Sequence, residues 1–259
     1  MSIADKLTTI AENTSKVYEA GKKDFEDSLV NYITNNGSRT YYSQAFRTAA
    51  FYKDNLIDFK GRCTPTDPSY MFYNMKGTHV PLGVDLSNIN TDSADILNNL
   101  FAYCAELLEI PDLNIPTPKK YSATYGYCYK LHTIHGKIRT DENTVFSASA
   151  FREDHALQNM EIEGIIGQNN FNVQWSKKLS GASIVSIIEA LSTTTSGLTV
   201  TLSQTAVDNM VFPITSTRTD AEGNEYTTTY NSWIDLAGDG IEGSPNEKGI
   251  RPNWTISLI

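Results

Sequence analysis

A short sequence unit recurs in the middle of this chain and constrains its fold more than any single residue does. The segment Phe101–Ile110 (FAYCAELLEI) returns as Tyr125–Ile134 (YGYCYKLHTI), with an aromatic residue, a cysteine, a leucine and an isoleucine at matching offsets. Cys104 and Cys128 mark the same place in the two copies. A fixed period of about 20–30 residues is the signature of a solenoid, in which one unit cannot bury its own apolar face and neighbouring units must stack.

The composition excludes two classes of partner. The longest apolar stretch, around residues 184–191, is much shorter than the ~20 residues that span a bilayer, so no membrane insertion is expected. The net charge is −9 and the lysines occur as isolated pairs, whereas a nucleic-acid partner requires clustered Lys and Arg. The first residues lack a basic segment followed by an apolar one, which predicts no secretory signal.

Residues 1–36 are predicted to form an amphipathic helix. Apolar residues recur along it in three-, four- and seven-residue steps, at Ile3, Leu7, Ile10 and Val17. Two interpretations remain open. The helix either packs on its own domain or serves as an oligomerising and docking helix, for which a homotrimer is the favoured state.

The remainder of the chain is predicted to have an α/β (α+β) fold, an irregular solenoid of short strands and helices. Residues 37–92 are rich in aromatic residues and are expected to cap the first apolar layer. Residues 93–259 are expected to hold the repeats, with strands beginning near Ile110, Ile134 and Ile162. The segment 134–138 also matches 162–166, at an offset slightly longer than that of the two cysteines.

Several further elements are expected in the second half. Apolar residues on one face predict a helix over 180–191, capped by Ser180 or Ser183, and strict alternation predicts a strand over 198–202. Residues 94–101 and 205–210 suggest short helices, and 80–86, 170–175 and 253–259 suggest strands. The stretch 213–252 interrupts the pattern and predicts a hairpin followed by a long inserted loop.

The search for catalytic chemistry gives no candidate. Cys63, Cys104 and Cys128 form no CxxC pair, and the spacing of His132 and His135 is not that of a helical zinc site. The loop around Asp235–Glu242 fails the spacing of a calcium loop. We therefore expect no catalytic residue, no metal site and no cofactor, although a carboxylate pair distant in sequence stays open.

Aromatic side chains are the better functional candidates. Rings bind sugars and proteins by stacking, and a tyrosine hydroxyl adds a hydrogen bond. The candidate binding residues are Tyr41, Tyr42, Tyr73, Tyr129 and His132. The further aromatic candidates on the cap and the repeat are Tyr70, Tyr103, Tyr125 and Tyr127. The alternative is that most of these rings lie in the core, as is expected for the aromatic residue three positions before each repeat cysteine.

The repeat resembles the leucine-rich repeat of the BspA type, in which an aromatic-x-x-Cys-x-x-Leu-x-x-Ile unit recurs. Both ends of the chain are also similar to phage and prophage structural proteins of gut Firmicutes. That similarity lies in Met1–Asn13 (MSIADKLTTIAEN), Lys16–Gly21 (KVYEAG), Asn36–Phe46 (NGSRTYYSQAF), Gly164–Asn169 (GIIGQN), Trp175–Ser180 (WSKKLS), Leu191–Ser203 (LSTTTSGLTVTLS) and Pro252–Leu258 (PNWTISL).

This resemblance implies a non-enzymatic virion protein of a phage tail, tail fibre or baseplate, made in the host cytoplasm. Its implied partners are other tail or baseplate proteins and a glycan or protein of the host surface. The resemblance carries over no catalytic residue, and the chain departs from it at 213–252, where the relatives have a shorter connection. The alternatives are a bacterial cell-surface leucine-rich-repeat adhesin and, third, a glycan-cleaving tail protein.

Overall fold

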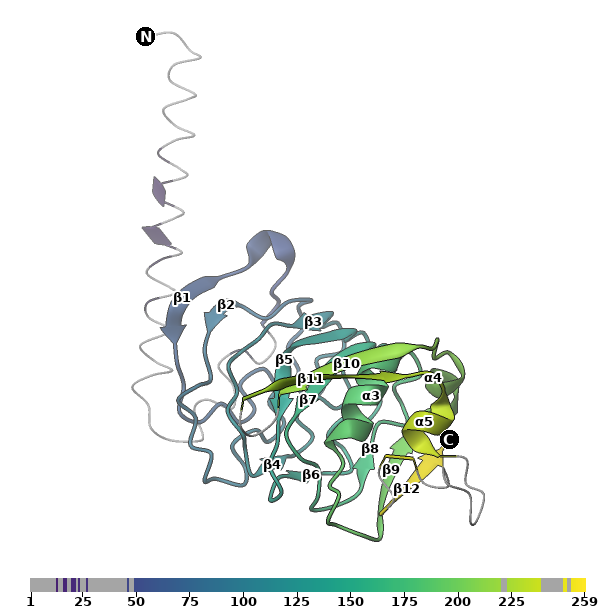
Figure 1. Ribbon diagram of the computed structural model, residues 1–259. Helices are drawn as coiled ribbons and strands as arrows, with labels where there is room; N and C mark the ends of the chain where they lie inside the picture. The colour runs from purple at the N-terminus through teal and green to yellow at the C-terminus, as the bar shows by residue number, and fades with distance from the viewer. Residues whose placement is uncertain are drawn as a thin grey trace.

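The chain has an α+β fold built mainly from short parallel strands (Figure 1). The computed structural model describes residues 49–219, 223–238, 249–250 and 253–259, together with Asn13, Lys16, Val17, Ala20, Gly21, Lys23, Asp27 and Phe46. The strands are β1 (Asp58–Cys63), β2 (Leu82–Val84), β3 (Glu109–Ile110), β4 (Lys120–Tyr121), β5 (Thr133–Arg139), β6 (Val145–Phe146), β7 (Asn159–Glu163), β8 (Phe171–Asn172), β9 (Leu198–Leu202), β10 (Ile214–Thr219), β11 (Glu225–Tyr230) and β12 (Trp254–Leu258). The helices are the 3-10 turn η1 (Lys53–Asn55), α3 (Gly181–Ala190), α4 (Gln204–Asp208) and α5 (Trp233–Ala237).

Successive passes of the chain lie side by side in parallel. The sheets run in the orders β1-β2, β3-β5-β7, β4-β6 and β12-β9-β8, all with parallel pairs, and β10-β11 is an antiparallel hairpin. Ile110 pairs with Ile134, and Ile138 pairs with Ile162. Both pairs have the same separation in sequence as Cys104 and Cys128, so the sequence period is the length of one pass of the chain.

The repeated unit supplies the core of this stack. In each unit a backbone N–H donates to the carbonyl three residues earlier, which forms a tight turn that begins or ends at one residue. We call this residue the central residue of the unit; it is Met75, Cys104, Cys128, Asp154 or Ser176. The aromatic or apolar residue three positions before the central residue is buried in every unit. The leucine three positions after it is also buried in the four units that have one. The units are Phe72-x-x-Met75, Phe101-x-x-Cys104-x-x-Leu107, Tyr125-x-x-Cys128-x-x-Leu131, Phe151-x-x-Asp154-x-x-Leu157 and Val173-x-x-Ser176-x-x-Leu179.

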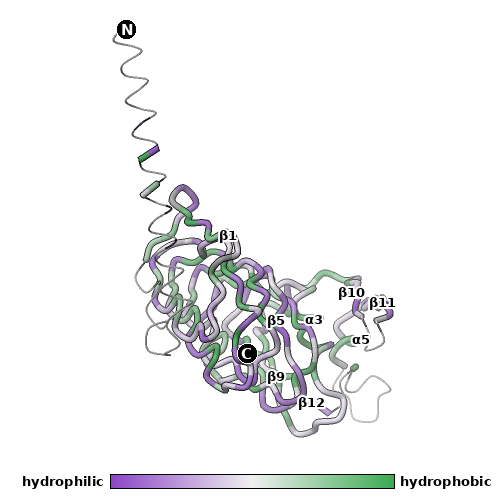
Figure 2. Tube along the Cα trace, turned by 90° about the vertical axis from the view of Figure 1, so that its left-hand side faces the viewer, coloured by the Kyte–Doolittle hydropathy of each residue, from purple (hydrophilic) through white to green (hydrophobic). Residues whose placement is uncertain are grey.

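Hydrophobic stretches accordingly recur from unit to unit along the chain instead of gathering in one segment (Figure 2). The rings of Phe72 and Phe101 stack at 5.0 Å and those of Phe101 and Tyr125 at 6.2 Å, with nearly parallel planes. Tyr125 continues to Phe151 at 5.3 Å. The expected core role of the aromatic residue before each cysteine is confirmed, because Phe101 is fully buried and Tyr125 nearly so.

Helix α3 ends the β3-β5-β7 sheet by taking the place of a further strand. Its N-terminus is capped by Ser180, whose hydroxyl accepts from the Ser183 N–H. The hydroxyl of Ser183 accepts from the Met160 N–H at 3.0 Å, and that of Ser186 accepts from the Ile162 N–H at 2.8 Å. The outer edge of β7 is thus hydrogen-bonded to side chains, which shields it from pairing with another chain.

Other expectations about elements are confirmed or corrected by the structure. The helix at 180–191, the strand at 198–202 and the hairpin in 213–252 are confirmed as α3, β9 and β10-β11. For residues 94–101 the sequence suggests a helical turn or a short helix; the segment forms turns and no continuous helix, because Asn99 has a left-handed φ of 53°. The strand expected over 170–175 ends at Asn172, because Val173 enters the next tight turn.

The longer-offset match of 134–138 with 162–166 is also wrong. In the structure Ile162 pairs with Ile138, while Ile134 lies opposite Ile110. Thr133 pairs with Asn159 and Lys137 with Glu161, so the register shifts within β5, but neither pairing has the offset of the sequence match. Among the described residues, none of the helices is long and apolar enough to cross a membrane.

Candidate recognition surfaces

Three side chains form a ladder of tyrosines on the outside of the tight turns. Tyr103 and Tyr127 stack with ring centroids 4.5 Å apart and planes 3° from parallel, and Tyr73 meets Tyr103 edge-on at 5.5 Å. The guanidinium of Arg152 lies 5.7 Å from the centroid of Tyr127 and extends the row into the next unit. We call Tyr73, Tyr103 and Tyr127 the tyrosine ladder.

Two members of the ladder are held in a costly backbone conformation. Tyr103 has φ 65° and Tyr127 has φ 67°, and both immediately precede the central cysteine of their unit. The same position holds Asn74 at φ 56° and Glu153 at φ 63° in neighbouring units. A left-handed residue with a bulky side chain costs about 1–2 kcal/mol, whereas Asn tolerates this region. The turn therefore does not require tyrosine there, and strain of this kind clusters at functional sites.

The ladder lies at the surface, where Tyr103 is exposed and Tyr73 and Tyr127 are half-buried. Tyr103 is 41% exposed even though its ring packs on Tyr127. Partial desolvation by its surroundings, and secondly the neighbouring Tyr127, raise the pKa of Tyr103 above its usual value. A tyrosine hydroxyl is protonated at neutral pH whether or not its pKa is raised, so it can donate a hydrogen bond to a ligand.

A second aromatic row lies next to the ladder, on the other side of the central residues. Tyr129 and His155 each follow a central residue directly, and their rings stack at 6.3 Å with an angle of 17°. His155 meets Trp175 edge-on at 5.9 Å and also contacts the Glu153 carboxylate at 2.9 Å. Tyr129 is 44% exposed. We call Tyr129 and His155 the second row, whereas Trp175 directly precedes Ser176 and so comes from the position that the ladder occupies in other units.

The open face of the β3-β5-β7 sheet carries charged side chains that largely pair with one another. His135 contacts Glu109 at 2.8 Å, and Lys137 lies 3.1 Å from Glu163, which also binds Arg139. The hydrogen bond with His135 lowers the pKa of Glu109, with smaller contributions from the His135 charge and other nearby histidines. Because the exposed charges are mutually paired, this face offers less free bonding capacity than the aromatic surface does.

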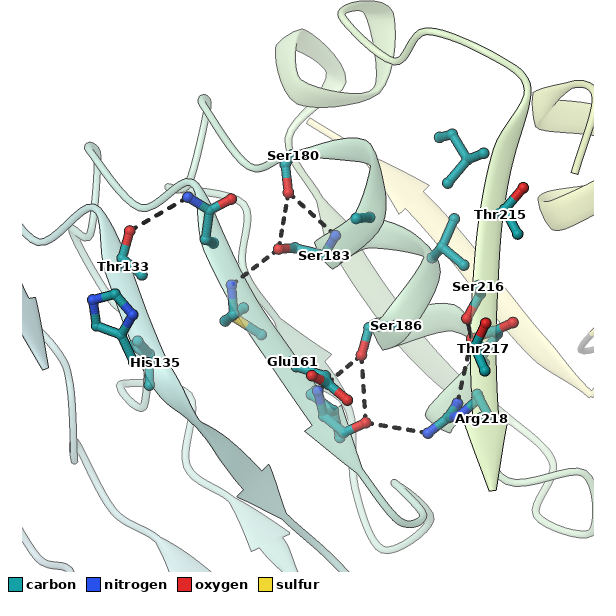
Figure 3. Close-up of a pocket in the computed structure, with 18 residues that line it drawn as sticks. Thr133, His135, Glu161, Ser180, Ser183, Ser186, Thr215, Ser216, Thr217 and Arg218 are labelled. Atoms are coloured by element: carbon teal, nitrogen blue, oxygen red, sulfur yellow. Dashed lines mark hydrogen bonds and ion pairs between the residues drawn. The ribbon is translucent and has the colours of Figure 1, made fainter. Parts of the chain in front are cut away.

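A groove lies beside this face, between the sheet, α3 and β10 (Figure 3). Its volume is about 410 Å³, and His135 and Thr133 face Thr215, Ser216 and Thr217 across it. Most of its polar groups already have partners. Ser183 and Ser186 bond the edge of β7, and the Arg218 guanidinium donates to the Ile162 carbonyl at 3.1 Å. We therefore assign the groove a structural role first.

A buried carboxylate at the rim of the groove explains this role. Glu189 on α3 accepts a hydrogen bond from Ser216 at 2.7 Å and one from the Tyr230 hydroxyl at 2.8 Å. Arg218 adds an ion pair at 3.6 Å, while the Glu189 side chain is only 6% exposed. These bonds fasten the β10-β11 hairpin to α3. Sequence reasoning misses them, because Glu189 stands on an otherwise apolar helix.

The thiols and carboxylates near the core are unsuited to nucleophilic chemistry. Burial raises the pKa of Cys63 to about 12 and raises that of Cys128 as well, so these thiols are protonated at neutral pH. Cys104 and Cys128 donate to the carbonyls of Phe72 and Phe101, one unit earlier. Within the described ranges, no group of three or more His, Cys, Asp or Glu is arranged to hold a metal ion.

The candidate residues of the sequence do not form one site. Tyr73 joins the tyrosine ladder and Tyr129 the second row, whereas His132 is half-buried at the start of β5, where its N–H donates to the Leu108 carbonyl. Tyr41 and Tyr42 lie outside the described residues. So do Ile3, Leu7 and Ile10, while Val17 has helical conformation and is 74% exposed.

The candidates named from the sequence omit Arg152, His155 and Trp175. Extending the repeat past its cysteines finds these three, because Phe151-x-x-Asp154 and Val173-x-x-Ser176 occupy the same turn with other central residues. The contacts between the rows follow from this stacking of units. Comparison of the chain with protein-family models, curated proteins and solved structures gave no match.

Proposed function

We propose that this chain is a non-enzymatic recognition protein whose exposed aromatic surface binds a ligand on a cell surface. One observation carries the proposal: Tyr103 and Tyr127 stack 4.5 Å apart at the surface, each in a left-handed conformation that disfavours tyrosine. A folding role does not account for them, because Asn74 and Glu153 occupy the same position. Exposed tyrosines in rigid frames are typical of binding surfaces.

The body that holds this surface is, in our proposal, an irregular leucine-rich-repeat-like solenoid. Its support is the parallel pairing of strands at the spacing of the sequence repeat and the recurrence of buried leucines after the tight turns. Stacked units of this kind display an extended surface instead of a deep catalytic pocket. The β10-β11 hairpin and α5 are additions to that plan and lie near the C-terminal end.

The setting we propose is a phage tail or baseplate, where the protein contributes to host attachment. The resemblance of both ends of the chain to phage and prophage structural proteins supports it. The amphipathic pattern of residues 1–36 fits a docking or trimerising segment. In this setting the partners are other tail proteins and a glycan or protein of the host surface.

Binding to cells tests the recognition role. Fluorescently labelled wild-type protein should bind host cells, and the variant Tyr103→Asn/Tyr127→Asn should bind at least tenfold more weakly. Asn suits the left-handed position, so the variant should keep its fold and melting temperature. The matched control is Tyr226→Asn, on the exposed face of the hairpin. Equal binding by the ladder variant and wild type would refute the proposal.

Mass spectrometry of purified particles tests the setting. The chain should be present in virions of the phage or induced prophage that encodes it, at a fixed ratio to the major tail protein. Its absence from particles, combined with presence on the bacterial surface, would favour an adhesin instead. Release of sugars from cell walls by wild-type protein would contradict the non-enzymatic assignment.

A further inference from the structure

The position that follows each central residue forms a row across the units. It holds Lys76, Ala105, Tyr129, His155 and Lys177 in order along the chain. The stacking of Tyr129 on His155 shows that side chains in this row lie over one another. The next position behaves in the same way, because Lys130 forms an ion pair with Glu106 of the preceding unit.

At Tyr129 the row changes from a small side chain to aromatic rings. His155 stacks on the Tyr129 ring, and the residue at the same position of the preceding unit is Ala105, whose side chain is a single methyl group. Within the part of the chain that the structure describes, His155 is the one ring in contact with Tyr129, which is 44% exposed. The ladder beside it shows the spacing of filled units, since Tyr103 and Tyr127 stack at 4.5 Å. From that spacing we infer room for one ring over Ala105.

The surroundings of this space are polar and offer both donors and acceptors. Glu106 and Lys130 form their ion pair in the next row, with side chains 48% and 56% exposed. The Tyr103 phenol is close enough to Tyr129 for the two to interact electrostatically, and a phenol can both donate and accept a hydrogen bond. A ring that enters over Ala105 therefore meets an aromatic face on one side and hydrogen-bonding groups at its rim.

We propose that the exposed face of Tyr129 over Ala105 is a stacking platform for one sugar ring of a surface glycan. The C–H face of a pyranose fits an aromatic face, and its hydroxyls suit the carboxylate, ammonium and phenol groups around it. A purely aromatic ligand would leave those polar groups without new partners. The proposal deepens the recognition role argued above and rests on it.

Filling the space is the direct test. In Ala105→Phe the new ring continues the row and covers Tyr129, and in Ala105→Ser the space stays open as the matched control. Saturation-transfer NMR with the methyl glycosides of glucose, galactose, rhamnose and N-acetylglucosamine measures binding. At least one glycoside should bind wild type and the Ser variant, and bind Ala105→Phe at least tenfold more weakly.

Two further variants keep the test decisive if Ala105→Phe fails to fold. Tyr129→Ala should lose glycoside binding, whereas Tyr129→Phe should retain it, because stacking needs the ring and not its hydroxyl. Binding of none of the four glycosides to wild type would overturn the proposal. So would tighter binding of phenol or indole than of any glycoside, since this would identify an aromatic side chain as the ligand.

Cell binding separates this inference from the recognition role. If Tyr103→Asn/Tyr127→Asn impairs cell binding and Ala105→Phe does not, the recognition surface stands and the sugar platform is wrong. If neither variant changes cell binding, the recognition role itself fails. If both impair it and the glycoside results hold, both conclusions stand.

Discussion

At the scale of single residues, the central position of the repeat accepts side chains of different chemistry. Cys104 and Cys128 each donate a thiol proton to a carbonyl of the preceding unit, and Asp154 stands at the same position, fully buried. One Asp154 oxygen accepts the Cys128 N–H at 3.0 Å, and the other has no hydrogen-bond partner in the described structure. Burial raises the pKa of Asp154 well above its usual value, so the folded state favours the protonated acid.

This burial predicts that Asp154 makes stability depend on pH. Because the folded pKa is raised, the folded state holds a proton that the unfolded chain releases above about pH 4. The contribution of Asp154 is therefore greatest below that pH and is lost as pH rises toward the folded pKa. Asp154→Asn keeps the acceptor for Cys128 and cannot titrate. Urea denaturation should show that its advantage over wild type grows from pH 4 to pH 7.5.

Asp54→Asn, at an exposed position of η1, is the control for this experiment and should leave the pH profile of stability unchanged. A constant difference between Asp154→Asn and wild type over the whole pH range would show that Asp154 does not titrate differently on folding.

Neighbouring positions of one unit should differ sharply in what they contribute to stability. Phe101 is fully buried between Phe72 and Tyr125, so Phe101→Ala should cost about 3–5 kcal/mol. Tyr103→Asn removes an exposed ring but relieves the left-handed strain, so its net cost should stay within about 1 kcal/mol. Thermal and urea denaturation measure both. A cost for Tyr103→Asn as large as that for Phe101→Ala would mean that the ladder is core structure.

Sequence reasoning reaches the buried residues of the unit more easily than the exposed ones. The spacing of Phe101, Cys104 and Leu107 specifies the core directly, because burial selects the residue type. It does not show that Asp154 or Ser176 can replace the cysteine, since the turn is held by backbone hydrogen bonds that many side chains permit. The tyrosine ladder depends on contacts between units, and these require the register of stacking.

At the scale of elements, α3 illustrates which features a local pattern can and cannot predict. Its apolar face and the Ser180 cap predict the helix to within a residue at each end. Its position at the edge of β7 is not predictable in this way, because the hydroxyls of Ser183 and Ser186 look like ordinary surface groups in the sequence. The bulge in β5 is similar, since it shifts the pairing without a marker residue.

Removing an edge hydroxyl should therefore cost more than a surface serine normally does. Ser186→Ala leaves the Ile162 N–H without its acceptor, and an unsatisfied buried group costs about 1–3 kcal/mol. Urea denaturation should show this loss, and hydrogen exchange should be faster at the Ile162 amide. Ser196→Ala, at an exposed position, should change neither quantity. Unchanged exchange at Ile162 in Ser186→Ala would mean that the hydroxyl does not protect the edge.

At the scale of the whole molecule, the solenoid proposed above must end in elements that cover its last apolar layer. The tight turns bring each unit onto its neighbour, so the chain advances from β1 and β2 at one end toward β9 and β12 at the other (Figure 1). Near that second end, α3 and the β10-β11 hairpin are found in place of further tight-turn units. Polar contacts join the hairpin to α3, through Glu189, Ser216, Arg218 and Tyr230.

The attachment of the hairpin should depend on one carboxylate. Glu189 binds Ser216, Arg218 and Tyr230, so Glu189→Ala removes the acceptor of two hydrogen bonds and an ion pair. Loss of such a buried partner costs on the order of 3 kcal/mol, and the hairpin should detach before the stacked units unfold. Limited trypsin digestion should then cleave after Arg218 much faster than in wild type. Glu225→Ala, at an exposed position of the same hairpin, is the control. Equal cleavage rates at Arg218 in Glu189→Ala and wild type would show that the hairpin is held by other contacts.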